Sequence, residues 1–124
     1  MYTMSMETSS NNLDNVKVQM RKGLLEYCIL LTIAREKKAY ASDILTELKK
    51  DDLLVVEGTL YPLLSRLKSD LLLDYEWEES SAGPPRKYYH LTPKGKLNLQ
   101  ALNETWEGLA TSINSLVKKY EKNH

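Results

Sequence analysis

Apolar residues recur along this chain in patterns that predict three helices near its start. From Lys17 to Glu36 the second half of the segment is apolar on nearly every side. Such a helix must be covered on more than one side, so we expect its own core on one side and a second subunit on the other. A short second helix is predicted over residues 42–48, with Ala41 or Ser42 near its N-cap, followed by a turn over residues 51–56.

The third predicted helix starts near Gly58 or Thr59, where leucines recur at spacings of three and four residues. The leucines of this buried stripe are Leu60, Leu63, Leu64, Leu67 and Leu71. Pro62 has no N–H to donate, so we expect it in the first turn, with Thr59 as the N-cap. The opposite, polar side carries Thr59, Tyr61, Pro62, Ser65 and Arg66. Two helices, a turn and a third helix with an outward polar face predict a helix-turn-helix.

After this helix the period falls from about 3.6 residues to 2, which indicates strands. Leu71, Leu73, Tyr75 and Trp77 alternate with mostly polar residues, and we expect Trp77 to pack under the strand pair. Residues 80–85 are rich in Ser, Gly and Pro and predict a turn, and residues 86–91 predict the return strand. The fold class expected is therefore mainly α with a small β-wing: a winged helix-turn-helix.

A long last helix is predicted from Thr92, the N-cap, and Pro93 to about Tyr120. Its apolar residues are spaced alternately by three and four, which is a heptad seam: Leu99, Leu102, Trp106, Leu109, Ile113, Leu116 and Tyr120. The helix could pack on its own domain, but a seam of this period at a chain end favours pairing between helices. We expect it to form the dimer interface.

The chain has 124 residues, enough for one domain with a modest core. We expect a flexible leader over residues 1–16, a DNA-binding domain over 17–92 and a dimerisation helix over 93–124. The leader has no basic n-region and is not a signal peptide, and no apolar run is long enough to cross a membrane. Cys28 is the single cysteine, interpreted as a core residue, and its lack of a disulfide partner fits a reducing cytoplasm.

The charge total does not by itself favour nucleic acid, because 17 basic residues face 17 acidic ones. Residues 57–79 carry two basic and six acidic groups, whereas residues 80–97 carry four basic groups and no acid. Those four are Arg86, Lys87, Lys94 and Lys96. Positive charge is thus concentrated around the predicted wing, although a solvated charged loop would give the same pattern.

No catalytic constellation is recognisable. The two histidines, His90 and His124, form no pair with Cys28, and there is no phosphate-binding glycine loop or zinc-ligand cluster. The acidic group Glu76, Glu78 and Glu79 is interpreted as the solvated face of a strand rather than a metal site. We expect neither an enzyme nor a bound metal or cofactor.

Four segments stand in this order along the chain: Arg21 to Glu26, Gly58-Thr59-Leu60-Tyr61-Pro62, Gly83 to Tyr89 and Leu91-Thr92-Pro93-Lys94-Gly95. Together they closely resemble the PadR family of bacterial transcriptional regulators. The resemblance implies a homodimeric winged-helix repressor that often senses small aromatic or toxic compounds, here of the short form with one C-terminal helix. Two positions depart from the family pattern: Ala82 replaces a common glycine, and His90 stands where arginine is usual.

These observations give a set of candidate site residues. Contacts to double-stranded DNA, at a palindromic operator, are predicted for Ser42, Thr59, Tyr61, Ser65, Arg66, Arg86 and Lys87. A flat aromatic effector is predicted at Trp106 with Asn103 and Ala110, although a tryptophan that only fills the dimer interface fits the spacing as well. The alternative function is a winged-helix module that binds protein instead of DNA, which would be expected to lose these basic groups.

Overall fold

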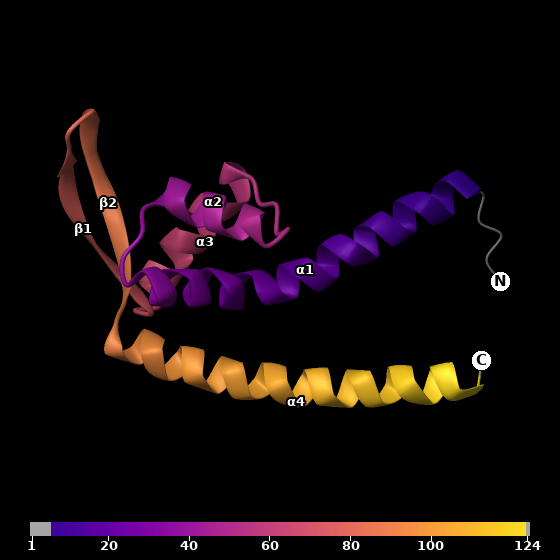
Figure 1. The fold of residues 1–124 in the computed structure, drawn as a ribbon. Coiled ribbons are helices and arrows are strands. Elements are labelled where there is room, and N and C mark those ends of the chain that lie inside the picture. Colours follow the sequence, from indigo (N-terminus) through magenta and orange to yellow (C-terminus); the bar gives the residue numbers. More distant parts are fainter. Residues whose placement is uncertain (1–5, 124) are drawn as a thin grey trace.

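A computed structural model describes the backbone of residues 6–123 and the side chains of residues 12–123. Its elements in chain order are α1 (Met6–Glu36), α2 (Ala41–Lys50), α3 (Glu57–Ser69), β1 (Leu73–Ser80), β2 (Gly83–Leu91) and α4 (Pro93–Asn123). The second half of α1, α2, α3 and the base of the β1–β2 hairpin form one compact body. The first half of α1 and most of α4 extend from it on the same side (Figure 1). This is the predicted winged helix-turn-helix with a long C-terminal helix.

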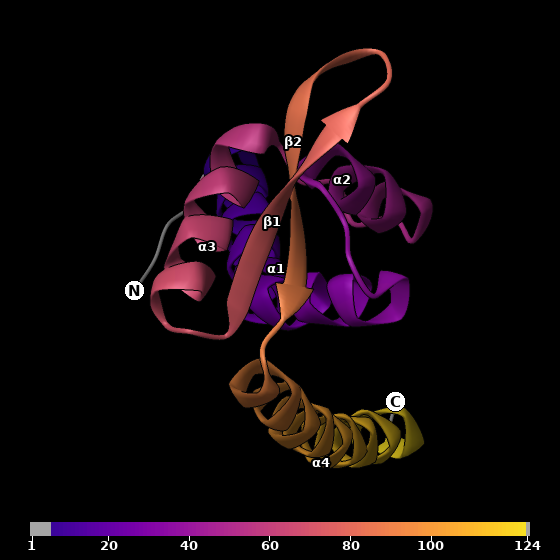
Figure 2. The same ribbon diagram turned by 90° about the vertical axis from the view of Figure 1, so that its left-hand side faces the viewer.

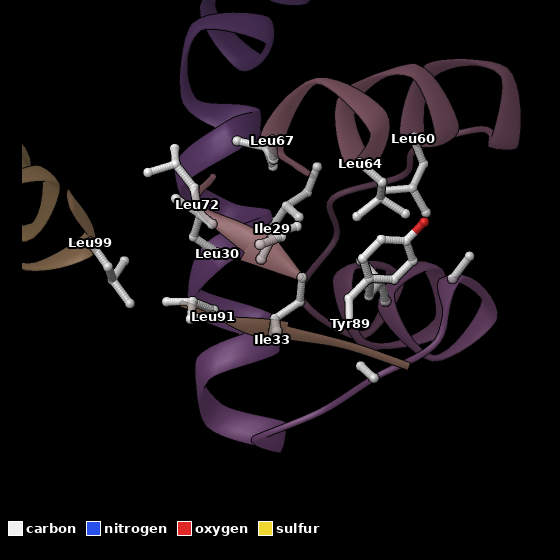
Figure 3. Packing of buried hydrophobic residues seen from close by; sticks show 14 of the residues in the cluster. Ile29, Leu30, Ile33, Leu60, Leu64, Leu67, Leu72, Tyr89, Leu91 and Leu99 are labelled. Carbon is white, nitrogen blue, oxygen red and sulfur yellow. The ribbon is translucent and has the colours of Figure 1, made fainter. Parts of the chain in front are cut away.

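The core lies between α1, α2, α3 and the lower half of the hairpin (Figure 3). Its fully buried side chains are Ile29, Leu30, Ile33, Ile44, Leu60, Leu64, Leu67 and Leu73. Each of them contributes about 1.5–3 kcal/mol by leaving water. Cys28 packs against this core as expected, and burial raises the pKa of its thiol. Of the predicted leucine stripe, Leu60, Leu64 and Leu67 are buried and Leu63 is partly buried, whereas Leu71 lies beyond α3 and is exposed.

The segment between α1 and α2 is attached to the hairpin by a short bridge. The Ala39 N–H donates to the Tyr89 carbonyl oxygen (3.0 Å), and the Tyr89 N–H donates to that of Ala39 (2.8 Å). On its other edge β2 pairs with β1 in antiparallel register, with Tyr75 opposite Tyr89 and Trp77 opposite Lys87. The lower hairpin is thus held by hydrogen bonds on both edges of β2.

The start of α4 is fastened to the turn that follows α3. The Thr92 hydroxyl donates to the Leu71 carbonyl oxygen (2.6 Å) and accepts from the Gly95 N–H (2.9 Å), which confirms Thr92 as the N-cap. The Thr92 N–H donates to the Leu72 carbonyl oxygen (3.1 Å), and Lys94 Nζ donates to that of Asp70 (3.1 Å). The start of α4 is therefore hydrogen-bonded to the turn that joins α3 to β1.

Three helix starts differ from the prediction. α1 begins at Met6 rather than Lys17, so residues 6–16 of the expected leader are helical, and residues 1–5 lie outside the described residues. The N-cap of α2 is Tyr40, not Ala41 or Ser42. The N-cap of α3 is Val56, not Thr59, so Pro62 lies inside the helix. Pro62 and Gly58 are both exposed, so water can satisfy the Gly58 carbonyl, which receives no N–H from Pro62.

The hairpin also differs from its prediction. The turn is confined to residues 81–82, and Pro84 and Pro85 belong to β2. Leu71 is 63% exposed, because the chain reverses there with φ 65° and turns Leu72 inward instead. Trp77 is 61% exposed and does not pack under the wing. The tip of the hairpin projects beyond the helices, and Trp77, in the strand that leads to this tip, is not part of the core cluster (Figure 2).

Gly95 tests the junction between α4 and the turn after α3. A Cβ at this position would lie 2.1 Å from the Leu72 carbonyl oxygen, so Gly95→Ala must push α4 away from β1. We expect a loss of about 2 kcal/mol or more in the free energy of unfolding, measured by denaturant titration. Gly108→Ala is the matched control: its Cβ meets nothing within 4 Å, and alanine favours the helix. Equal stability of the two variants would contradict the close contact.

Candidate nucleic-acid interface

A groove of about 450 Å³ opens between the start of α2, the exposed side of α3 and the inner face of the hairpin. It is lined by Tyr40, Ala41, Ser42, Tyr61, Ser65, Trp77, Arg86, Lys87 and Tyr89. Five of the seven residues predicted to contact DNA are therefore brought together here, from three separate segments. The other two, Thr59 and Arg66, do not line the groove.

The exposed side of α3 carries two stripes. Tyr61 and Ser65, four residues apart, face the groove, whereas Thr59 and Arg66, seven apart, share the other flank of the helix. Arg66 extends to α1, where its Nη2 donates to Glu26 Oε2 at 2.8 Å. The guanidinium is thus engaged within the chain, in an ion pair that is exposed and therefore weak.

Both cations of the wing lie over aromatic rings. The guanidinium carbon of Arg86 is 4.5 Å from the ring centroid of Tyr40. Lys87 Nζ is 4.7 Å from the centroid of Tyr75 and 5.3 Å from that of Trp77. Such cation–π contacts contribute about 0.5–1 kcal/mol at exposed sites. They hold the positive charges beside the groove.

Two of the four acidic groups of β1, Asp74 and Glu78, are engaged with lysines. Glu78 Oε2 accepts from Lys38 Nζ at 2.6 Å, and this hydrogen bond raises the pKa of Lys38. Asp74 lies 3.5 Å from Lys68 Nζ and accepts from the Tyr75 N–H at 2.8 Å, the bond that mainly lowers the pKa of its carboxyl. The negative charge noted in residues 57–79 is thus partly neutralised next to the groove.

Sequence reasoning missed three aromatic residues of the groove: Tyr40, Trp77 and Tyr89. For Trp77 and Tyr89 a signal existed, because the two strands combine aromatic residues with the basic pair Arg86 and Lys87, and aromatic rings beside positive charge are typical of nucleic-acid-binding surfaces. Tyr40 gave no such signal. It reaches the groove only because Ala39 bridges to Tyr89.

The heptad seam of α4 divides into two parts. Leu99 is buried in the chain's own core, and Leu102 packs against that core. The remaining seam residues are exposed: Trp106, Leu109, Ile113, Leu116 and Tyr120. The facing half of α1 likewise exposes apolar residues, among them Leu13, Val16 and Met20. Near Trp106, Asn103 Oδ1 accepts from the Tyr27 hydroxyl (2.5 Å), which links α4 to α1, and Ala110 is half-buried.

Within the described residues, no group of three or more His, Cys, Asp or Glu side chains could hold a metal ion. Over the same part of the chain, no helix combines the length and the apolar character needed to cross a membrane.

Comparison with known proteins assigns this architecture. The model of the transcriptional regulator PadR-like family matches residues 29–101, which span the C-terminal end of α1, the helices α2 and α3, the wing and the start of α4. The chain belongs to the PadR-like family. Members of this family are DNA-binding transcriptional regulators and not enzymes.

Solved structures of PadR-like proteins agree with the assignment. A PadR-like transcription factor from Bacteroides fragilis is 59% identical, covers 82% of this chain and 98% of its own, and superposes with a TM-score of 0.69. A PadR-like transcriptional regulator from Bacillus cereus is 40% identical over 80% of this chain and 96% of its own, with a TM-score of 0.73. A PadR family regulator from Eggerthella lenta is 27% identical, covers 88% and 95%, and has a TM-score of 0.74.

Proposed function

We propose that this PadR-like regulator is a cytoplasmic repressor that binds a palindromic operator as a homodimer and releases it in response to a small aromatic effector. The observation that carries the DNA contact is the groove between α3 and the wing, where Arg86 and Lys87 stand beside the polar side of α3. A protein that places a helix in the major groove and a basic hairpin on the DNA backbone needs the helix and the hairpin side by side in this way.

Each predicted DNA contact has a role in this arrangement. Tyr61 and Ser65 would enter the major groove from the side of α3 that faces the wing. Thr59 and Arg66 would contact the same major groove from the other flank of α3. Arg66 would have to leave its ion pair with Glu26 to do so. Ser42, in the first turn of α2, would approach a phosphate together with free N–H groups of that helix.

The wing contact predicts a change in salt dependence. Each phosphate contact contributes about 0.9 to the slope of log K against log salt, so replacing Arg86 and Lys87 by alanine should flatten the slope by about 1.8 per subunit. Binding would be measured by fluorescence anisotropy across a salt series. Changing Lys118 and Lys119 to alanine removes the same charge from α4, far from the wing, and should leave the slope nearly unchanged. If both double variants behave alike, the wing does not contact phosphates.

Dimerisation is proposed through the exposed part of the α4 seam and the apolar residues of α1. Burying a leucine side chain contributes on the order of 2 kcal/mol, so several must take part to outweigh the entropy lost on association. From Trp106 to Tyr120 the seam supplies five exposed apolar or aromatic side chains, two of them leucines, and α1 adds Leu13, Val16 and Met20. The two long helices project to the same side of the winged body, which leaves them accessible to a second copy (Figure 1).

A charge in this seam should separate the subunits. Leu109→Asp or Ile113→Asp would bury an unpaired carboxylate, and sedimentation should then show monomers or an unfolded chain. Ser115→Asp places the same charge on α4 outside the seam and should remain dimeric. A well-folded dimer of Leu109→Asp and Ile113→Asp would place the interface elsewhere.

The effector site is proposed around Trp106, with Asn103 and Ala110 beside it. Two indole rings near the two-fold axis would leave room for a flat aromatic ligand to stack between them, gaining about 0.5–1.5 kcal/mol per ring pair beyond area burial. The Asn103 amide NH₂ would remain able to donate to the ligand, because Tyr27 uses the carbonyl oxygen. A ligand there would change the separation of the two α3 helices and so the operator affinity.

Tryptophan fluorescence tests this site. Titrating planar aromatic compounds should quench the wild type, and Trp106→Ala should lose both the quenching and the affinity while Trp77 stays as an internal reference. If quenching and affinity survive the substitution, Trp106 only packs, and any effector site lies elsewhere.

A further inference from the structure

Arg86 stands in a cluster that also holds a carboxylate placed to neutralise it. In the hairpin register Glu78 lies directly opposite Arg86, and opposite charges in facing positions of two strands normally attract. Glu78 instead accepts a hydrogen bond from Lys38 Nζ at 2.6 Å. Over the described part of the chain, Arg86 forms no ion pair, and its guanidinium lies over the Tyr40 ring.

Lys38 and Tyr40 reach this cluster from the same short segment. Between them Ala39 bridges to Tyr89 and is fully buried. Residues on either side of a bridged position point to the opposite face, so Lys38 and Tyr40 both face away from the core. Both also contact Tyr88 of β2: Lys38 Nζ is 5.3 Å from its ring centroid, and the Tyr40 ring meets it edge-on at 5.2 Å.

This geometry leaves the donors of Arg86 free. The contact with the Tyr40 ring uses the positive charge of the guanidinium, and over the described residues no hydrogen bond or ion pair engages its five N–H groups. A bidentate contact to a phosphate needs two of those donors on one edge. If Arg86 paired with Glu78, the same N–H groups would donate to the carboxylate and could not donate to a phosphate.

We propose that Lys38 and Tyr40 are positioning residues for DNA binding: Tyr40 holds the Arg86 guanidinium at the groove, and Lys38 keeps Glu78 from pairing with it. The inference rests on the proposed contact of Arg86 with DNA. Neither residue need touch DNA itself, and both belong to the α1–α2 connection rather than to the wing. The ability of Arg86 to bind a DNA phosphate therefore depends on the connection between α1 and α2, which lies outside the wing.

The test measures affinity for a mixed-sequence duplex of about 30 base pairs at low salt, since phosphate contacts do not depend on sequence. Tyr40→Phe keeps the ring and should bind like the wild type. Tyr40→Leu removes it and should weaken binding roughly two- to fivefold, the value of an exposed cation–π contact. Lys38→Met should weaken binding as well, because Glu78 is then free to turn to Arg86.

The decisive comparison repeats both substitutions in the Arg86→Ala background. If Lys38 and Tyr40 act through Arg86, Tyr40→Leu and Lys38→Met should cause little further loss there. A loss of the same size in both backgrounds would overturn the inference, because it would reflect a general charge or structural effect. Thermal melts check that each variant is folded. Lys38→Met changes an exposed side chain, so its comparison in the two backgrounds remains informative even if Tyr40→Leu is unstable.

The outcome separates this inference from the proposed function. If Arg86→Ala binds as tightly as the wild type, the wing contact itself is absent and the inference falls with it. If Arg86→Ala weakens binding while Tyr40→Leu and Lys38→Met lose equally in both backgrounds, only the positioning role is wrong.

Discussion

The backbone bridge between Ala39 and Tyr89 is the interaction on which the candidate interface depends. It gives β2 a hydrogen-bonded neighbour on each edge and brings the start of α2 against the hairpin. The Tyr89 ring is buried between α3 and the hairpin, where burial raises the pKa of its phenol. Without this attachment, a two-stranded hairpin would be only marginally stable, and its cations would have no fixed position relative to α3.

The second constraint lies at the opposite end of the hairpin, where Thr92 and Lys94 hold the start of α4 against the turn after α3. Hydrogen bonds to three successive carbonyl groups, of residues 70–72, leave little freedom between α3 and the first turn of α4. A dimer formed through the far part of α4 would therefore transmit its geometry to α3 through a stiff connection. This is the physical basis on which a ligand between two α4 helices could alter DNA binding.

Several errors of sequence reasoning have a common cause. The alternation from Leu71 to Trp77 indicates a strand correctly, but it does not show how far the core extends along that strand. Leu71 falls in a turn, and Trp77 lines the open groove rather than the core, so neither is buried. Similarly, the N-cap of α3 was misplaced because a proline is expected in the first turn of a helix, whereas α3 begins at Glu57 and carries Pro62 inside it, with the unbonded Gly58 carbonyl open to water.

The sequence by itself determined the fold class, the order of the elements and the concentration of basic residues at the wing, because periodicity and turn residues are local properties of the chain. It also determined Thr92 and Pro93 as the start of α4, since capping involves neighbouring residues. Only the tertiary structure decided that Tyr40 lies under Arg86, that Lys38 engages Glu78 and that Arg66 is held by Glu26. Each of these contacts joins residues about 40 or more positions apart, and its existence depends on how the elements pack rather than on any local pattern.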